Sequence, residues 1–209
     1  MKLLKILAVA LIATSAYANS MIALSVQPMR GAKGSYLLNE GYDHKYQWVF
    51  NGEYGWRLGD HLALGPSVAF SWNIKRVMAN EDLNLLGRKE RVFMIPASFF
   101  VLIDPFPRFM IHPIAHVSLG YNSVFISNVD YQVKDNEIVK KRDGYYSGFI
   151  AKFGVDCMLD IGKTISLFAG PQWQITEVER KSNNYRTGGA RPIENFNAFG
   201  FRFGVNILL

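Results

Sequence analysis

The feature that most limits what this chain can fold into is a stripe of apolar residues at every second position, which returns eight times. In the clearest case Trp48, Phe50 and Tyr54 fall on one face of an extended segment, and Gln47 and Asn51 fall on the other. Successive side chains of a β-strand point to opposite faces, whereas the side chains of an α-helix return to the same face after about 3.6 residues. The pattern therefore predicts an all-β protein with eight strands.

The second face of these strands indicates how they pack together. It is crowded with Gly, Ala and Ser, whereas a soluble β-sandwich shows long polar side chains to water. Small residues suit the narrow interior of a closed barrel, where side chains from all strands converge. Segment 92–103 is apolar on both faces, so its register stays open. The expected strands span 22–27, 46–58, 62–74, 92–103, 111–122, 148–159, 165–176 and 198–209.

The gaps between the strands alternate between short and long. Tight turns rich in turn-forming residues are expected at 59–61, 104–107 and 160–163. Long polar stretches cover 29–45, 75–91, 126–144 and 177–194. Strands of about 10 residues joined in this way are typical of bacterial outer-membrane barrels, with short periplasmic turns and long extracellular loops. We therefore expect an eight-stranded antiparallel up-and-down transmembrane β-barrel.

The first residues predict export from the cytoplasm. Lys2 and Lys5 form a short basic region, an apolar run follows, and Ala16-Tyr17-Ala18 has the small-x-small pattern of a cleavage site. We expect a signal peptide over 1–18, which leaves 19–209 as a single barrel domain. The apolar run is well short of the roughly 20 residues that a transmembrane helix needs.

With these segments in place, the chain resembles the small eight-stranded outer-membrane barrels of the OmpA/OmpX type, often described as porin-like. The resemblance covers the whole of 19–209. The last strand, Phe199 to Leu209, resembles the family's C-terminal assembly signal, although that signal usually ends in an aromatic residue. The resemblance implies a protein of the outer membrane that contacts the barrel assembly machinery through this strand. We expect it to be a monomer that does not bind nucleic acid.

The charge of the long polar stretches points to a surface role. They hold 16 basic and 12 acidic residues, while the rest of 19–209 holds 5 of each, so the whole excess lies in the expected extracellular loops. Lipopolysaccharide presents phosphates and carboxylates there, and Lys and Arg bind such groups. Solvated loops without a ligand are an equally good interpretation. An aromatic girdle is expected at the loop ends of the strands, formed by Tyr46, Trp48, Trp72, Tyr121, Tyr145 and Trp173.

Five charged residues alternate with the apolar stripes and are expected inside the barrel: Glu53, Arg57, Lys152, Asp156 and Arg202. An eight-stranded barrel is just wide enough to be filled by its own side chains. A buried charge is costly without a partner. We therefore expect a paired network that closes the lumen, with a small gated pore as the alternative.

One weak catalytic pattern stands beside this network. His116 and Ser118, with Asp130 downstream, loosely resemble the His-x-Ser and acid of the lipid A deacylase family, whose members are also eight-stranded barrels. That family has Glu in place of Asp130 and Asn in place of Leu119, and the alternation points both side chains inward, away from lipid. We expect no enzyme, with a deacylase-like esterase as the less favoured alternative. His112 and His116 have no obvious third ligand, so no metal or other cofactor is expected.

Overall fold

The computed structural model describes residues 20–32, 46–77, 88–128, 144–181 and 193–209. Within these ranges the regular structure is entirely β-strand. The expected signal peptide and Asp130 lie outside the described residues. The strands are β1 (Ser20–Gly31), β2 (Tyr46–Leu58), β3 (Leu62–Val77), β4 (Arg88–Ile103), β5 (Ile111–Asn128), β6 (Gly144–Asp160), β7 (Ile165–Arg180), β8 (Ile193–Asn195) and β9 (Ala198–Leu208).

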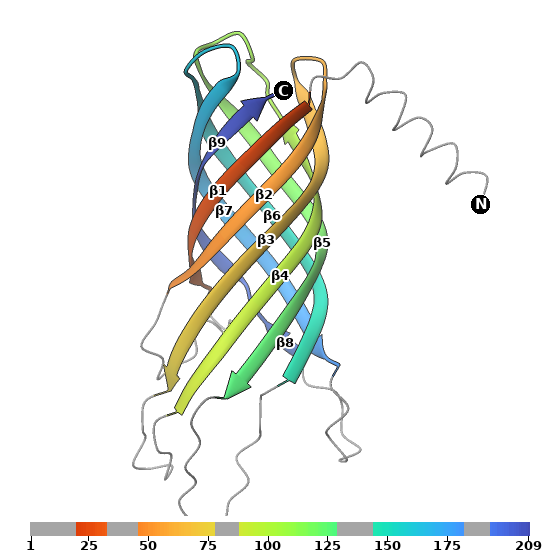
Figure 1. Cartoon of the computed structure of the whole chain (residues 1–209), viewed down its shortest axis with the longest axis vertical. Coiled ribbons are helices and arrows are strands. Elements are labelled where there is room, and N and C mark those ends of the chain that lie inside the picture. The colour runs from red at the N-terminus through yellow and green to blue at the C-terminus, as the bar shows by residue number, and fades with distance from the viewer. Residues whose placement is uncertain (1–19, 33–45, 78–87, 129–143, 182–192) are drawn as a thin grey trace, which may run out of the picture.

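The strands close into a barrel (Figure 1). Each pairs antiparallel with the next along the chain from β1 to β7, and β9 pairs with both β7 and β1. The short β8 continues the line of β9 along β7, and between them the backbone N–H of Phe196 donates to the carbonyl of Thr176 at 2.9 Å. β8 and β9 are thus two pieces of the eighth strand, and the predicted eight-stranded antiparallel barrel is confirmed.

The strands are strongly staggered. A path of paired residues that leaves β1 at Ser20 and passes once around the barrel returns to β1 at Arg30. The intermediate residues of that path are Trp56, Leu64, Val101, Val117, Phe153, Trp173 and Phe199. A stagger of this kind tilts the strands against the barrel axis, as closure requires.

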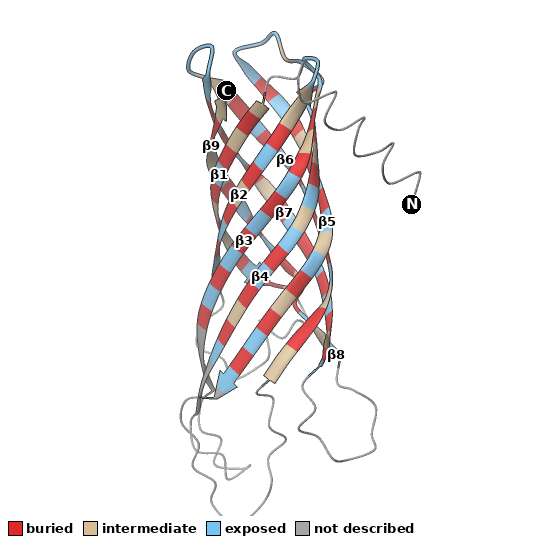
Figure 2. Cartoon of the chain, turned by 45° about the vertical axis from the view of Figure 1, so that its right-hand side comes forward, coloured by how far each residue is buried: buried red, intermediate tan, exposed pale blue. Residues whose placement is uncertain are grey.

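Side chains alternate between the lumen and the outer face along every strand (Figure 2). The alternation also fixes the register of β4, which the sequence left open. Met94, Phe100 and Leu102 are buried in the lumen, whereas Phe99 and Ile103 are exposed on the outer face. The two apolar faces of β4 thus have different surroundings: one points into the lumen, and the other forms part of the outer surface.

The three short connections lie at one end of the barrel, which we call the turn end, together with the chain terminus at Leu209 (Figure 1). They occupy 59–61, 104–110 and 161–164. The second is longer than predicted, because Asp104 organises it. Its Oδ1 accepts a hydrogen bond from the backbone N–H of Phe106 at 3.0 Å, and the N–H of Phe109 donates to the carbonyl of Phe106 at 3.2 Å. Gly59, with φ of 72°, adopts the left-handed conformation that favours glycine.

At the opposite end, the loop end, the strands run further than predicted. β5 reaches Asn128 and β7 reaches Arg180, so the outer parts of the expected long stretches are still strand. On β7 the prediction stopped where the outward apolar stripe stops, whereas on β5 Phe125 continues that stripe beyond the predicted end. The lumen side continues, because Val124, Ile126 and Val178 are buried there and keep the hydrogen-bonded ladder in place.

The side chains that point into the lumen form layers. Along β6 the inward residues run from Tyr146 at the loop end, through Lys152 and Asp156, to Met158 at the turn end. Apolar layers thus lie on both sides of a charged band. The loop-end layer consists of Met29, Val49, Ala69, Val92, Met94, Val124, Ile126, Tyr146, Val178, Phe196 and Ala198. The turn-end layer consists of Met21, Ala23, Ala63, Phe100, Leu102, Ile114, Met158 and Phe168.

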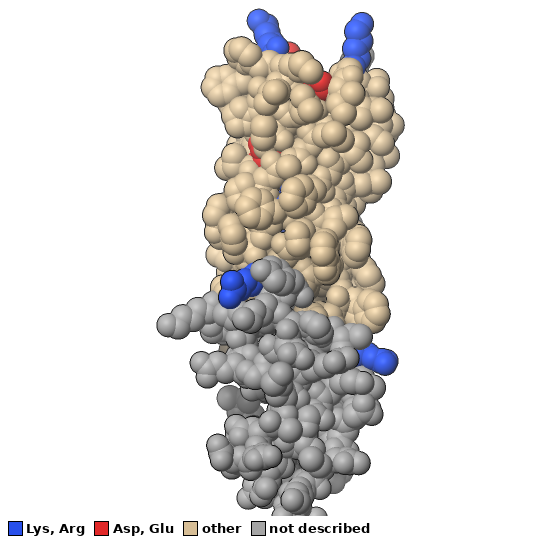
Figure 3. Space-filling view, turned by 90° about the vertical axis from the view of Figure 1, so that its left-hand side faces the viewer, with Lys and Arg blue, Asp and Glu red and all other residues tan. Residues whose placement is uncertain are grey.

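The outer face is apolar over the middle of the barrel. Among the described residues in Figure 3, Lys and Arg atoms lie at the turn end and beside the border with the grey residues at the loop end, and none is seen between these two places. Large side chains such as Val117, Phe153 and Phe203 are exposed on this outer wall. Exposed contiguous apolar surface of this extent marks a membrane or protein contact. Among the described residues, no helix is long and apolar enough to cross a membrane.

Candidate functional site

The charged band in the lumen is organised around Arg202 of β9, whose side chain is only 1% exposed. Its Nη2 donates to Glu53 Oε2 of β2 at 2.5 Å, and its Nη1 donates to Asp156 Oδ2 of β6 at 3.2 Å. Nε lies 3.4 Å from Ser25 Oγ of β1, and the guanidinium sits 4.5 Å from the ring centroid of Phe168. The planar fork of Arg thus joins two carboxylates from strands that are not neighbours.

The second oxygen of Glu53 is also occupied. Oε1 accepts from Asn51 Nδ2 at 2.7 Å and lies 3.0 Å from His116 Nε2. Asn51 in turn accepts from Ser67 Oγ at 2.9 Å, and Gln172 Nε2 lies 3.5 Å from His116 Nδ1. An imidazole protonated at Nε2 satisfies both of its contacts, since it donates to Glu53 and accepts from Gln172. Glu53 is 3% exposed, so its charge is held almost entirely by these side chains.

Lys152 lies in the same band but is held differently. It is buried, yet its ammonium makes no hydrogen bond or ion pair with any residue that the structure describes. Asp156 Oδ1 and Gln172 Oε1 are also buried without a hydrogen-bond partner among those residues. The band therefore has a fully connected half around Arg202 and Glu53, and a half whose polar atoms are open. With two carboxylates and two cations, it is formally neutral when His116 is neutral.

Arg57 does not join the band. Its Nη2 lies 3.4 Å from the carbonyl oxygen of Asp60, at the turn end, and the side chain is half-buried. Arg57 and Glu53 point to the same side of β2, but Arg57 is next to the last residue of the strand. The alternation of residues along β2 predicts the face on which Arg57 lies. It does not predict how far along the barrel axis the side chain is placed. Of the five expected residues, the structure brings together Glu53, Asp156 and Arg202 through direct contacts and places Lys152 beside them.

His116 is the member of the band that the sequence did not assign to it. Its inward position on β5 was visible in the alternation, but its pairing with Glu53 depends on how β2 and β5 face each other across the lumen. The ring also stacks on Phe100, with centroids 5.9 Å apart and an interplanar angle of 20°. Ser118 is buried on the same face and makes no hydrogen bond to His116. The ring nitrogens of His116 therefore face Glu53 and Gln172, and not a serine nucleophile.

The expected aromatic girdle lies on the outer face as far as it is described. Trp48, Trp72, Tyr121 and Trp173 are exposed there, Tyr145 is half-buried, and the side chain of Tyr46 lies outside the described residues. Trp173 stacks on Phe153 at 5.6 Å between centroids and contacts Phe199 at 5.1 Å. The Tyr121 hydroxyl donates to Ser147 Oγ at 2.6 Å. In the part of the chain that the structure describes, no group of His, Cys, Asp and Glu is placed to hold a metal ion.

No protein-family model matches the chain, and no curated protein matches it in sequence. Its fold, however, matches solved structures. The crystal structure of Neisserial surface protein A aligns with a TM-score of 0.54 at 12% identity, covering 91% of this chain and 97% of that one. The chain has the fold of a small outer-membrane β-barrel.

Two further structures fall in the same group. Ail, the attachment invasion locus protein of Yersinia pestis, aligns with a TM-score of 0.48 at 11% identity, covering 91% of this chain and 97% of that one. OprG from Pseudomonas aeruginosa aligns with a TM-score of 0.48 at 11% identity, and the alignment covers 92% of this chain and 96% of that one. The barrel topology and the likeness to Neisserial surface protein A confirm the predicted resemblance for the fold, and at 12% identity that likeness concerns the fold alone.

Proposed function

We propose that this protein is a non-enzymatic barrel of the bacterial outer membrane whose lumen is closed by its own side chains. It is exported by the signal peptide at 1–18, and 19–209 is its single domain. The apolar outer wall supports the membrane location, because large exposed side chains such as Phe153 and Phe203 form the kind of outward apolar band that faces lipid in such barrels. Its role is structural, or it acts at the cell surface through the long segments at the loop end.

The observation that carries this proposal is the layering of the lumen. Arg202 donates hydrogen bonds to both Glu53 and Asp156, and an apolar layer lies on each side of these three residues. A conducting channel needs a continuous hydrated path. Here the two apolar layers fill the interior above and below the charged band, as expected for a barrel of eight strands.

The contacts of His116 support the absence of catalysis. A serine nucleophile needs a base within hydrogen-bond reach. His116 is held instead by Glu53 and Gln172, and the lumen position separates Ser118 from the lipid on the outer face. Release of acyl chains from lipid A by the purified protein, lost in Ser118→Ala, would replace this proposal with the deacylase alternative.

A small gated pore is the second candidate, and one observation favours it. Asp156 Oδ1 and Gln172 Oε1 are buried without hydrogen-bond partners among the described residues, and Lys152 is buried in the same band. Buried polar groups are normally paired with protein or with water. Water near these atoms would be the first part of a conducting path.

The loop-end segments are the proposed surface for partners. The sequence excess of basic over acidic residues lies in them, so lipopolysaccharide is the partner whose chemistry they fit best. The last strand supports a contact with the barrel assembly machinery, since Phe199, Phe201 and Phe203 present an alternating aromatic face. We propose that the protein acts as a monomer and binds no nucleic acid.

Conductance in planar lipid bilayers separates the two candidates. The parent protein should conduct little or not at all. Glu53→Ala should raise conductance, because it removes the carboxylate that joins Arg202 to His116. The matched control is Glu177→Ala, on the exposed outer face at the loop end, which should leave conductance unchanged. Steady conductance of the parent that Glu53→Ala does not alter would make the pore the better assignment.

A further inference from the structure

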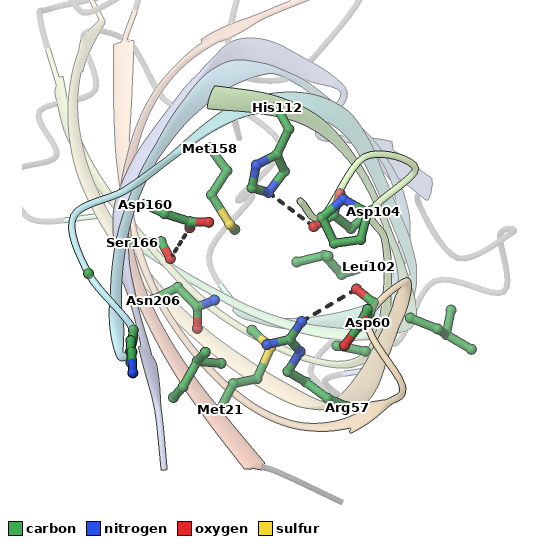
Figure 4. A pocket seen from close by; sticks show the side chains of 16 residues that line it. Met21, Arg57, Asp60, Leu102, Asp104, His112, Met158, Asp160, Ser166 and Asn206 are labelled. Atoms are coloured by element: carbon green, nitrogen blue, oxygen red, sulfur yellow. Dashed lines mark hydrogen bonds and ion pairs between the residues drawn. The ribbon is translucent and has the colours of Figure 1, made fainter. Parts of the chain in front are cut away.

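A polar cavity of about 290 Å³ opens at the turn end of the barrel (Figure 4). Its floor is apolar and includes Met21, Leu102 and Met158, which belong to the turn-end layer of the lumen. That floor separates the cavity from the charged band. Its volume lies near the lower end of small-molecule sites, which begin at about 300 Å³.

Part of the polar lining is occupied by the turn itself. His112 Nδ1 lies 2.7 Å from the carbonyl oxygen of Phe109, and its Nε2 lies 3.0 Å from Asp104 Oδ2. Asp104 Oδ1 accepts from the backbone N–H of Phe106. These groups shape the wall of the cavity, and His112 Nε2, although close to Asp104, is buried without a hydrogen-bond partner among the described residues.

Three other polar side chains of the lining keep open positions. The guanidinium of Arg57 makes a single long hydrogen bond, to the carbonyl of Asp60. Asp160 uses Oδ1 to accept from Ser166 Oγ at 2.6 Å, which leaves Oδ2 open. Asn206 is only 6% exposed, and its Oδ1 has no partner among the described residues. A buried, unpaired amide oxygen is costly unless something bonds to it.

The cavity is also lined by Asp60 and Lys163, so both signs of charge are present in its wall. The three side chains with open positions lie on different sides of it. Asn206 and Asp160 lie on one side of the opening in Figure 4, and Arg57 projects towards it from the other. A simple anion placed there would meet Asp160 as well as Arg57. A simple cation would meet Arg57 as well as Asp160. A molecule that carries both a positive and a negative group can pair its positive group with Asp160 and its negative group with Arg57.

We propose that this cavity binds a small zwitterion with an ammonium and a carboxylate, such as a free dipeptide. The ammonium donates to Asp160 Oδ2 and Asn206 Oδ1, and the carboxylate accepts from the guanidinium of Arg57. Arg recognises carboxylates through paired N–H donors, and charge-assisted hydrogen bonds are the stronger kind. In the proposed orientation of the barrel, the cavity faces the periplasm.

Titration calorimetry on the full protein in detergent micelles tests this site, with glycylglycine as the probe. Two blocked probes serve as controls: N-acetylglycylglycine, which lacks the ammonium, and glycylglycinamide, which lacks the carboxylate. Glycylglycine should bind at least about tenfold more tightly than either blocked probe, because each loses a charge-assisted contact. Absence of binding, or equal binding of all three probes, would overturn the proposal.

Substitutions then assign each charge to its side chain. Arg57→Gln should weaken glycylglycine at least about tenfold and leave the weak binding of glycylglycinamide unchanged. Asp160→Asn should weaken glycylglycine as well, and leave N-acetylglycylglycine unchanged. Arg30→Gln, on the exposed outer face at the loop end, is the matched control and should bind like the parent. Folding of each variant is verified by its heat-dependent gel mobility. Equal effects of Arg57→Gln and Arg30→Gln would contradict the site.

Discussion

Two charges on the same side of one strand, Glu53 and Arg57 of β2, have different surroundings. Glu53 lies in the middle of the lumen, where Arg202, His116 and Asn51 contact its two oxygens. Arg57 lies at the turn end and makes one long contact with a backbone carbonyl. The middle of the barrel thus holds charges that are locked in a network, while the end holds charges that can still accept a partner. The position of a charged side chain along the barrel axis, and not its residue type, decides whether it is locked in a network or open to a partner. The reason is that burial removes water as the competing partner.

The largest effect should come from Arg202→Met. This change leaves Glu53 and Asp156 buried without their cation, which typically costs about 3–5 kcal/mol. Urea unfolding of the protein in lipid vesicles measures the loss. Arg57→Met is the matched control at the turn end. If both variants lost a similar free energy of unfolding, charges in the middle of the lumen and at the turn end would not differ in their contribution to stability.

On the outer face too, a substitution in the middle of the barrel should cost more stability than one near its end. Val117→Arg places a charge on the exposed wall at mid-strand in β5, where such substitutions cost about 2–4 kcal/mol in lipid. Ser127→Arg, on the outer face near the loop end of the same strand, should cost about 0–1 kcal/mol. Unfolding in vesicles of both variants gives the comparison. An equal cost would mean that the bilayer is not centred on the middle of the wall.

Lys152→Met should have a smaller effect than Arg202→Met although both residues are buried. Lys152 makes no ion pair or hydrogen bond with the described residues, so the substitution breaks none. A Met of similar length fills its space, and the expected loss is about 1 kcal/mol or less. A loss as large as that of Arg202→Met would show that Lys152 is a full member of the network.

Arg57→Met should have the smallest effect on stability. A half-exposed charge at the end of the barrel contributes about 0–1 kcal/mol. The same urea titration in vesicles provides the measurement. A loss above this range would show that Arg57 stabilises the turn end more than its single long hydrogen bond indicates.

The alternation of side chains revealed most of the fold but only part of the site. It puts Glu53, Lys152, Asp156 and Arg202 on the inner face, and all four are buried in the structure, because the face of a strand follows directly from its period. It left the register of β4 open, because both faces are apolar there, and it ended β5 and β7 short of their loop-end limits. The partnership of His116 with Glu53 depends on the stagger between strands, which no single strand encodes.

The position of Arg202 on the last strand has a consequence for the order of assembly. Glu53 and Asp156 come from strands that are synthesised earlier, and neither has its guanidinium partner until β9 is seated between β7 and β1. A half-closed intermediate therefore holds two carboxylates with only Lys152 of β6 as a cation in the band, and an incompletely paired band is disfavoured in lipid. The final closure step supplies the guanidinium that pairs both carboxylates. Completion of the seam is thus coupled to charge neutralisation at the centre, so the barrel gains much of its stability only when the last strand arrives.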